Sequence, residues 1–142
     1  MYARRSWWPT YLRVFNFAPY HLAADPAHGQ KAKKILENIE AGERCATTTL
    51  VITQVCSYLK WKKKHEAIPI FLSLLKRLTS LNKVETTVLD LEEARSMQSA
   101  LKLSWSIWDD IVIAAQMKRL KIKEIYSNDK DFDNIRLVKR VF

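Results

Sequence analysis

Short strand-like segments alternate with amphipathic helical segments along almost the whole chain. Strands are expected at residues 11–18, 45–47, 84–88, 123–127 and 137–142. The longer segments between them repeat apolar residues at helical spacing. This alternation is typical of an α/β domain in which helices flank a short, mostly parallel central sheet. The sequence therefore predicts one such domain over residues 1–142.

Each expected helix is defined by its apolar face. The first face has Ala32, Ile35, Leu36 and Ile39 at positions i, i+3, i+4 and i+7. The later faces carry Val51, Val55, Tyr58 and Leu59; Phe71, Leu74, Leu75 and Leu78; Ala94, Met97 and Leu101; and Ile107, Ile111, Ala114 and Ala115. These spacings predict five helices that each turn one side toward a shared core.

Several helix ends have characteristic residues. Asp25-Pro26 is expected to open the first helix and Gly42 to end it, because Asp and Pro favour helix starts and Gly favours helix ends. Two later starts look like capping boxes, in which a polar cap is followed three residues later by an acid. Asp90 with Glu93 forms one of these pairs, and Ser106 with Asp109 forms the other.

Composition limits the possible functions. The only glycines, Gly29 and Gly42, cannot form a Gly-rich phosphate-binding loop. A formal net charge of +9 favours partners with phosphate backbones or acidic surfaces. No apolar run approaches the roughly 18 residues that span a bilayer, and the start MYARRSWWP has no apolar signal core. We therefore expect a cytoplasmic protein without membrane contact.

Acidic side chains gather at two places that a parallel sheet would bring together. The stretch IYSNDKDFDN places Asp129, Asp131 and Asp133 just past an expected strand, and Asp109-Asp110 opens the preceding helix. The carboxyl ends of strands meet at one edge of such a sheet, which is where ligands bind. Converging carboxylates suit Mg²⁺ or Mn²⁺, which prefer oxygen ligands.

Each acid also has a simpler interpretation. Asp109 is explained by the capping box alone. Asp131 and Asp133 are also explained as solvated turn residues. Asp110 and Asp129 are the two acids that this pattern leaves for a metal site.

The C-terminal acids resemble those of a known family. Asp110 precedes the apolar-alanine run IVIAA, Ser127-Asn128-Asp129 follows a strand, and Asp131-Phe132 comes next. This arrangement is similar to the C-terminal half of PIN domains, most of all the VapC-type toxins. HLAADPAHGQKAKKILENIEAGE and TTTLVITQV match the first helix and the entry to the second. The resemblance covers residues 20–142, whereas residues 1–19 match poorly and are treated as an atypical N-terminal segment.

The resemblance implies a compact PIN-like α/β fold and a Mg²⁺- or Mn²⁺-dependent endoribonuclease. Asp110 and Asp129 are then expected to bind the metal ion, with Asp131 as a further candidate ligand. Asn16 and Ser127 are expected to orient these acids by hydrogen bonds. RNA is the implied substrate, and the implied partners are a small antitoxin protein and a second copy of the chain in a homodimer.

Two positions depart from the family pattern. Val14 stands where the family has the acid of its first strand, and Gln54 stands where it has a glutamate. Gln54 is at most a neutral ligand, so we expect weak metal binding and weakened cleavage. The alternative is a non-catalytic PIN-like module that binds RNA or a protein. A shifted reading frame or an altered start is a further explanation for Val14.

Two other clusters are candidate interaction surfaces. Lys60, Lys62, Lys63 and Lys64 surround Trp61 and form a candidate RNA-binding site, with a solvated helix end as the alternative. Trp7, Trp8, Trp105 and Trp108 form a candidate dimer or antitoxin surface. For Trp105 and Trp108 the alternative is that they close the core.

Overall fold

The computed structural model describes residues 13–15, 29–127 and 129–141, and within them it contains a five-stranded sheet. The strands are β1 (Arg13–Phe15), β2 (Cys45–Thr48), β3 (Leu81–Val84), β4 (Glu124–Tyr126) and β5 (Lys139–Val141). Their order across the sheet is β3-β2-β1-β4-β5. Every neighbouring pair is parallel, so the predicted α/β fold with a parallel central sheet is confirmed.

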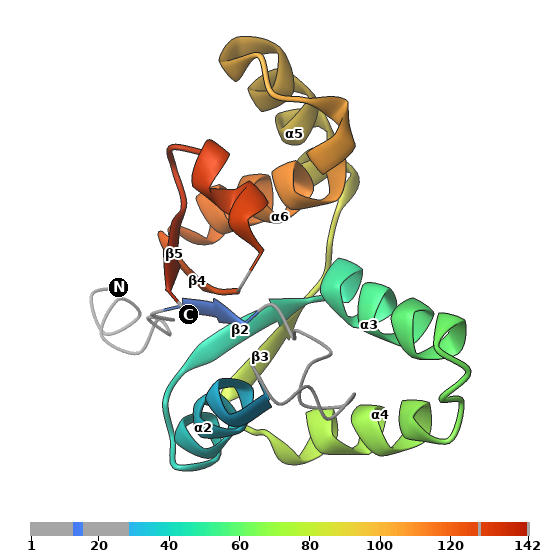
Figure 1. The fold of residues 1–142 in the computed structure, drawn as a ribbon. Coiled ribbons are helices and arrows are strands. Elements are labelled where there is room, and N and C mark those ends of the chain that lie inside the picture. The colour runs from blue at the N-terminus through green and yellow to red at the C-terminus, as the bar shows by residue number, and fades with distance from the viewer. Residues whose placement is uncertain (1–12, 16–28, 128, 142) are drawn as a thin grey trace.

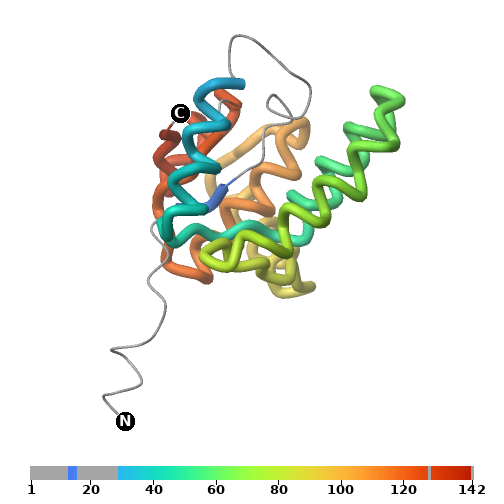
Figure 2. Tube along the Cα trace, turned by 90° about the horizontal axis from the view of Figure 1, so that it is seen from below, coloured from blue at the N-terminus to red at the C-terminus, as the bar shows by residue number. Residues whose placement is uncertain are grey.

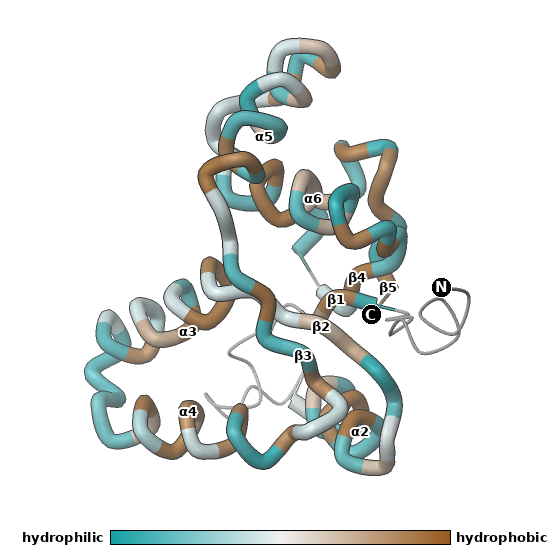
Figure 3. The backbone as a smooth tube through the Cα atoms, turned by 180° about the vertical axis from the view of Figure 1, so that it is seen from behind, coloured by the Kyte–Doolittle hydropathy of each residue, from teal (hydrophilic) through white to brown (hydrophobic). Residues whose placement is uncertain are grey.

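Helices lie on both sides of this sheet. They are α2 (Gly29–Glu40), α3 (Thr49–Trp61), α4 (Ala67–Arg77), α5 (Val88–Leu101) and α6 (Trp108–Leu120), with short 3₁₀ turns η1 (Trp105–Ile107) and η2 (Lys130–Asn134). Figure 1 shows α5 and α6 on one side and α2, α3 and α4 on the other. Figure 3 shows the same two groups from behind. Figure 2 shows that α3 and α4 form a hairpin that stands out from the rest of the coloured trace.

Helix α6 lies at the centre of the core. All seven residues from Ile111 to Met117 are buried, and Ile111 and Ile113 have no exposed surface. A helix that is apolar around most of its circumference is stable only when neighbours cover it on several sides. Helix α5 packs along α6, and the buried strand residues Phe15 and Ile125 belong to the same core cluster.

The first described helix agrees closely with its sequence pattern. Its predicted apolar residues Ala32, Ile35, Leu36 and Ile39 are all buried. Gly42 has a φ of 115°, its N–H donates to Ile39 O over 3.0 Å, and the Glu43 N–H donates to Asn38 O over 3.0 Å. These two bonds form a Schellman motif, so Gly42 ends the helix as predicted. The predicted start at Asp25-Pro26 lies outside the described residues.

Several predicted boundaries were wrong around the third strand. The strand expected at 84–88 is β3, which ends at Val84 and pairs with β2 in the register Leu81 to Cys45. Thr87 caps α5, because its hydroxyl accepts from the Asp90 N–H and the Asp90 carboxylate accepts from the Thr87 N–H. Asp90 is therefore the third residue of the helix in a true capping box and not its cap.

The predicted cap of α6 was also wrong. The residue before the helix is Ile107, which makes no side-chain cap bond. Ser104, not Ser106, caps the preceding 3₁₀ turn by accepting from the Ser106 N–H. Asp109 instead accepts a hydrogen bond from Gln54, a contact between residues far apart in the sequence.

The tryptophans near this turn are only partly in the core. The rings of Trp105 and Trp108 contact each other with centroids 5.5 Å apart. Trp108 packs against the core, whereas Trp105 is 56% exposed. Trp7 and Trp8 lie outside the described residues.

A buried amide joins α6 to the segment between β3 and α5. Gln116 is fully buried, and its side-chain nitrogen donates to Val84 O and Glu85 O over 3.4 and 3.0 Å. Its oxygen accepts from the Thr86 hydroxyl over 2.9 Å, and Thr86 in turn accepts from the Leu50 N–H. This network therefore connects α6 to the start of α3.

Replacing Gln116 tests this network. Gln116→Leu should lower the free energy of unfolding by about 1–3 kcal/mol, because Thr86 and two carbonyls lose a buried partner. Urea denaturation measures the change. Gln30→Leu, on an exposed position of α2, is the control and should have little effect. Equal stability of the two variants would contradict this role.

Candidate metal centre

Three acids from different elements meet beyond the carboxyl ends of the strands. Asp110 lies in the first turn of α6, Asp129 follows β4, and Asp131 lies in η2. One carboxylate oxygen from each lies within 4.8 Å of the others. Helix α6 runs antiparallel to the strands. Its first turn and the end of β4 therefore lie at the same edge of the sheet, where the strands have their carboxyl ends.

Local hydrogen bonds order the loop that carries two of these acids. Ser127 is 2% exposed, and its hydroxyl accepts from the Asp129 N–H over 3.1 Å. The Asp129 carboxylate accepts from the Asp131 N–H over 2.9 Å, which makes Asp129 the cap of η2. Side-chain to backbone bonds of this kind fix a short polar turn without a longer element.

The three carboxylates repel one another. Burial first, and then the charges of Asp129, Asp131 and Asp109, together raise the pKa of Asp110 to about 7. Within the described ranges, none of the three cluster acids forms a salt bridge. A divalent cation would relieve this repulsion, and an all-oxygen donor set fits a hard cation such as Mg²⁺ or Mn²⁺.

The neighbouring acids have other partners. Asp133 accepts two hydrogen bonds from the Arg140 guanidinium, over 3.0 and 3.1 Å, and these bonds lower its pKa. The Asp109 carboxylate accepts from Gln54 Nε2 over 3.0 Å. These two carboxylates therefore flank the cluster and are already paired.

The structure places the other predicted site residues as follows. Ser127 lies directly beside the cluster, and Gln54 donates to Asp109, the sequence neighbour of Asp110. The lysines at positions 60, 62, 63 and 64 lie at the far end of α3. Val14, at the substituted family position, is fully buried in β1. Asn16 lies outside the described residues.

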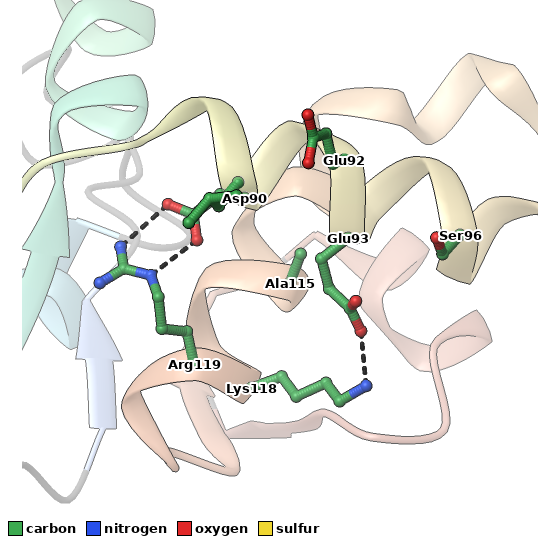
Figure 4. A pocket seen from close by; sticks show the side chains of 8 residues that line it. Asp90, Glu92, Glu93, Ser96, Ala115, Lys118 and Arg119 are labelled. Atoms are coloured by element: carbon green, nitrogen blue, oxygen red, sulfur yellow. Dashed lines mark hydrogen bonds and ion pairs between the residues drawn. The ribbon is translucent and has the colours of Figure 1, made fainter.

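A second group of charged residues lies between α5 and α6 (Figure 4). Arg119 donates to both oxygens of Asp90 over 2.7 and 2.9 Å, and Lys118 pairs with Glu93. Each of these acids faces a cation, so this pocket lacks the repulsion found at Asp110. Sequence reasoning missed the Asp90–Arg119 pair, because 29 positions separate the partners and no local pattern joins them.

The fold and the acids together define a class of protein: a parallel α/β domain with a carboxylate cluster at the carboxyl edge of its sheet. The PIN domain family model matches residues 16–137, and the chain belongs to this family. PIN domains are typically nucleases and generally use divalent metal ions.

A solved structure supports the same fold. Mycobacterium tuberculosis VapC20, a toxin that cleaves the sarcin-ricin loop, is 19% identical with a TM-score of 0.69, and the match covers 84% of this chain and 92% of that one. A search of curated proteins finds no match. Among the described helices, none has the length and apolar character needed to cross a membrane.

The pKa of Asp110 predicts how stability depends on pH without metal. Between about pH 4, the ordinary range of an unfolded aspartate, and about pH 7, the folded state holds a proton that the unfolded state has lost. The free energy of unfolding of the natural chain should therefore fall as pH rises through this window. Asp110→Asn lacks this group, so its Tm in EDTA should rise relative to the natural chain from pH 5 to pH 8.

Asp133→Asn is the matched control for this measurement. It removes a carboxylate whose pKa is lowered by Arg140, so it should give no relative gain in Tm at pH 8. A Tm difference between Asp110→Asn and the natural chain that does not change with pH would contradict the raised pKa of Asp110.

Proposed function

We propose that this chain is a divalent-metal-dependent endoribonuclease of the VapC type, with residues 1–142 forming one PIN-like domain. The observation that carries the proposal is the convergence of Asp110, Asp129 and Asp131, whose oxygens lie within 4.8 Å of one another. Membership of the PIN family supplies the reaction class, which is hydrolysis of a phosphodiester bond.

In this proposal Asp110, Asp129 and Asp131 hold one Mg²⁺ or Mn²⁺ ion. When bound, the ion would orient and activate water and stabilise charge on the phosphate. Ser127 fixes the loop of Asp129 through its hydrogen bond to the backbone. Asn16, which follows β1 in the sequence, is also proposed to orient the acids. Asp110 has to lose its proton to bind the ion, so metal affinity should increase toward and above pH 7.

Two neutral residues weaken the proposed site. Val14 offers no oxygen from its side chain, and Gln54 offers at most a neutral carbonyl. The amide nitrogen of Gln54 is already bonded to Asp109. Mg²⁺ keeps several water ligands when protein ligands are few, so binding is expected to be weak and cleavage slow.

RNA is the proposed substrate, because the net charge of +9 favours a phosphate backbone. A small antitoxin protein and a second copy of the chain are proposed as protein partners, and the cytoplasm as the location. These proposals rest on the VapC-type resemblance. The competing function, supported by Val14 and Gln54, is a non-catalytic module that binds RNA or a protein.

Metal binding and cleavage test the proposal together. The natural chain should bind Mn²⁺ in calorimetry and cleave a labelled RNA in Mn²⁺ or Mg²⁺, and EDTA should abolish cleavage. Asp110→Asn and Asp129→Asn should each lose the metal signal and at least about tenfold in cleavage rate, because each removes a charged ligand from a small set.

Asp133→Asn is again the matched control, since it removes a carboxylate that Arg140 already pairs. It should leave metal binding and cleavage close to those of the natural chain. Cleavage that persists in EDTA or in Asp110→Asn would overturn the nuclease assignment. Metal-independent RNA binding without any cleavage would favour the non-catalytic function.

The proposed homodimer has a direct test. Sedimentation of the purified chain should give about twice the 16.6 kDa mass of one copy. A mass of one copy over the whole concentration range would contradict it.

A further inference from the structure

The tip of the α3–α4 hairpin combines an exposed aromatic ring with a group of lysines. We call residues 60–64 the hairpin tip. Trp61 is the last residue of α3 and is 74% exposed. The hairpin stands out from the rest of the coloured trace (Figure 2), so the tip lies away from the sheet. An exposed tryptophan surrounded by cations needs an explanation, because burying its ring would be favourable.

Neighbouring side chains hold this ring on one side. The Tyr58 ring lies with its centroid 6.2 Å from that of Trp61. The Lys62 ammonium lies 5.0 Å from the Trp61 centroid and 5.8 Å from the Tyr58 centroid. Cation–π attraction of this kind orders both rings and the lysine.

The backbone of the tip is also ordered. The Lys63 N–H donates to Lys60 O over 3.0 Å, and the Lys64 N–H donates to Leu59 O over 2.8 Å. These bonds end α3 in a Schellman motif, with Lys63 in the left-handed region at a φ of 57°. A lysine adopts this conformation less readily than glycine does, and the two hydrogen bonds fix the backbone of the turn.

Within the part of the chain that the structure describes, no acidic side chain neutralises the charge of the tip. Lys60, Lys62, Lys63 and Lys64 form no ion pair with any carboxylate of the described residues. Four ammonium groups within five positions repel one another unless an anion lies among them. Phosphate groups spaced along a nucleic acid strand would meet this requirement.

We propose that the hairpin tip is a binding site for single-stranded RNA, in which an unpaired base stacks on Trp61 and the lysines contact the flanking phosphates. The proposal rests on RNA being the substrate of the acidic cluster. Aromatic rings stack on bases of any sequence, and lysines follow the backbone. A paired A-form helix keeps its bases stacked inside, so the tip should prefer single strands or loops.

The composition of the tip favours RNA over a protein partner. Protein interfaces are enriched in aromatic residues and arginine but depleted in lysine. Here lysines provide all four charges around Trp61.

Helix α3 links the hairpin tip to the acidic cluster. Gln54 contacts Asp109, the neighbour of Asp110. Trp61 lies seven positions further along α3, which corresponds to about 10 Å of helix. A strand held at the tip could therefore extend along α3 toward the cluster over roughly three stacked nucleotides, at about 3.4 Å each. The tip would then hold the substrate at a distance from the bond that is cut.

The first test is whether the aromatic ring of Trp61 contributes to RNA affinity. The full-length chain is titrated in EDTA into a fluorescein-labelled oligouridylate, and fluorescence anisotropy reports binding without cleavage. Trp61→Leu should weaken binding about 5- to 150-fold, because it removes the stacking ring. Trp61→Phe keeps a ring and should retain most of the affinity. The same strand in a duplex with oligoadenylate should bind more weakly, with little difference between the two variants.

Salt dependence gives the second test. Lys62→Ala with Lys63→Ala should reduce the slope of log K against log salt by roughly 1.4, because each phosphate contact contributes about 0.7 on a single strand. Lys76→Ala, at the other end of the hairpin, is the control for loss of charge and should leave the slope nearly unchanged.

Equal affinity of Trp61→Leu and Trp61→Phe would overturn the proposal, as would a slope in the double variant equal to that of Lys76→Ala. Unchanged RNA binding with altered self-association in sedimentation would assign the tip to a protein contact instead. These measurements in EDTA do not depend on cleavage. A loss of cleavage in Asp110→Asn with unchanged RNA affinity therefore concerns the acidic cluster alone.

Discussion

The burial of α6 in the core sets the position of the acidic cluster. Seven consecutive residues, Ile111 to Met117, are covered by the sheet and the neighbouring helices. A helix held this firmly cannot rotate without exposing apolar surface, at about 25 cal/mol for each Å². The same contacts fix the direction of its first turn, and with it the place of Asp110. The core therefore supplies the precision that a metal site requires.

The acidic cluster destabilises the folded state, and the packing of the core offsets this cost. Burial of Asp110, together with the charges of Asp129 and Asp131, raises its pKa to about 7, so keeping this carboxylate ionised at neutral pH costs folding free energy. The neighbouring carboxylates show how a protein avoids such a cost, because Asp133 is paired with Arg140 and Asp90 with Arg119. Three clustered carboxylates that form no salt bridge within the described residues, beside acids that do, are typical of a metal-binding site.

Helix α3 joins the two proposed sites. In the middle of this helix Gln54 contacts Asp109, and at its end Trp61 and the lysines form the hairpin tip. The network of Gln116 and Thr86 ties the start of this helix to α6. Helix α3 would therefore position a substrate held at the tip relative to the acids, without movement of another segment.

The features that local spacing encodes can be predicted from the sequence. The alternation of elements, the buried face of α2, the Schellman turn at Gly42 and the grouping of Asp110 with Asp129 all follow from short-range periodicity and from the rule that strand ends share an edge. The capping box of Thr87 with Asp90 is also local, but the sequence pattern was assigned to Asp90 and Glu93 instead. The bond from Gln54 to Asp109 and the contacts of Gln116 with Glu85 and Thr86 arise from tertiary packing. These depend on partners up to 55 positions apart. Local propensity cannot identify such partners, because which polar groups meet is decided by how the helices pack on the sheet.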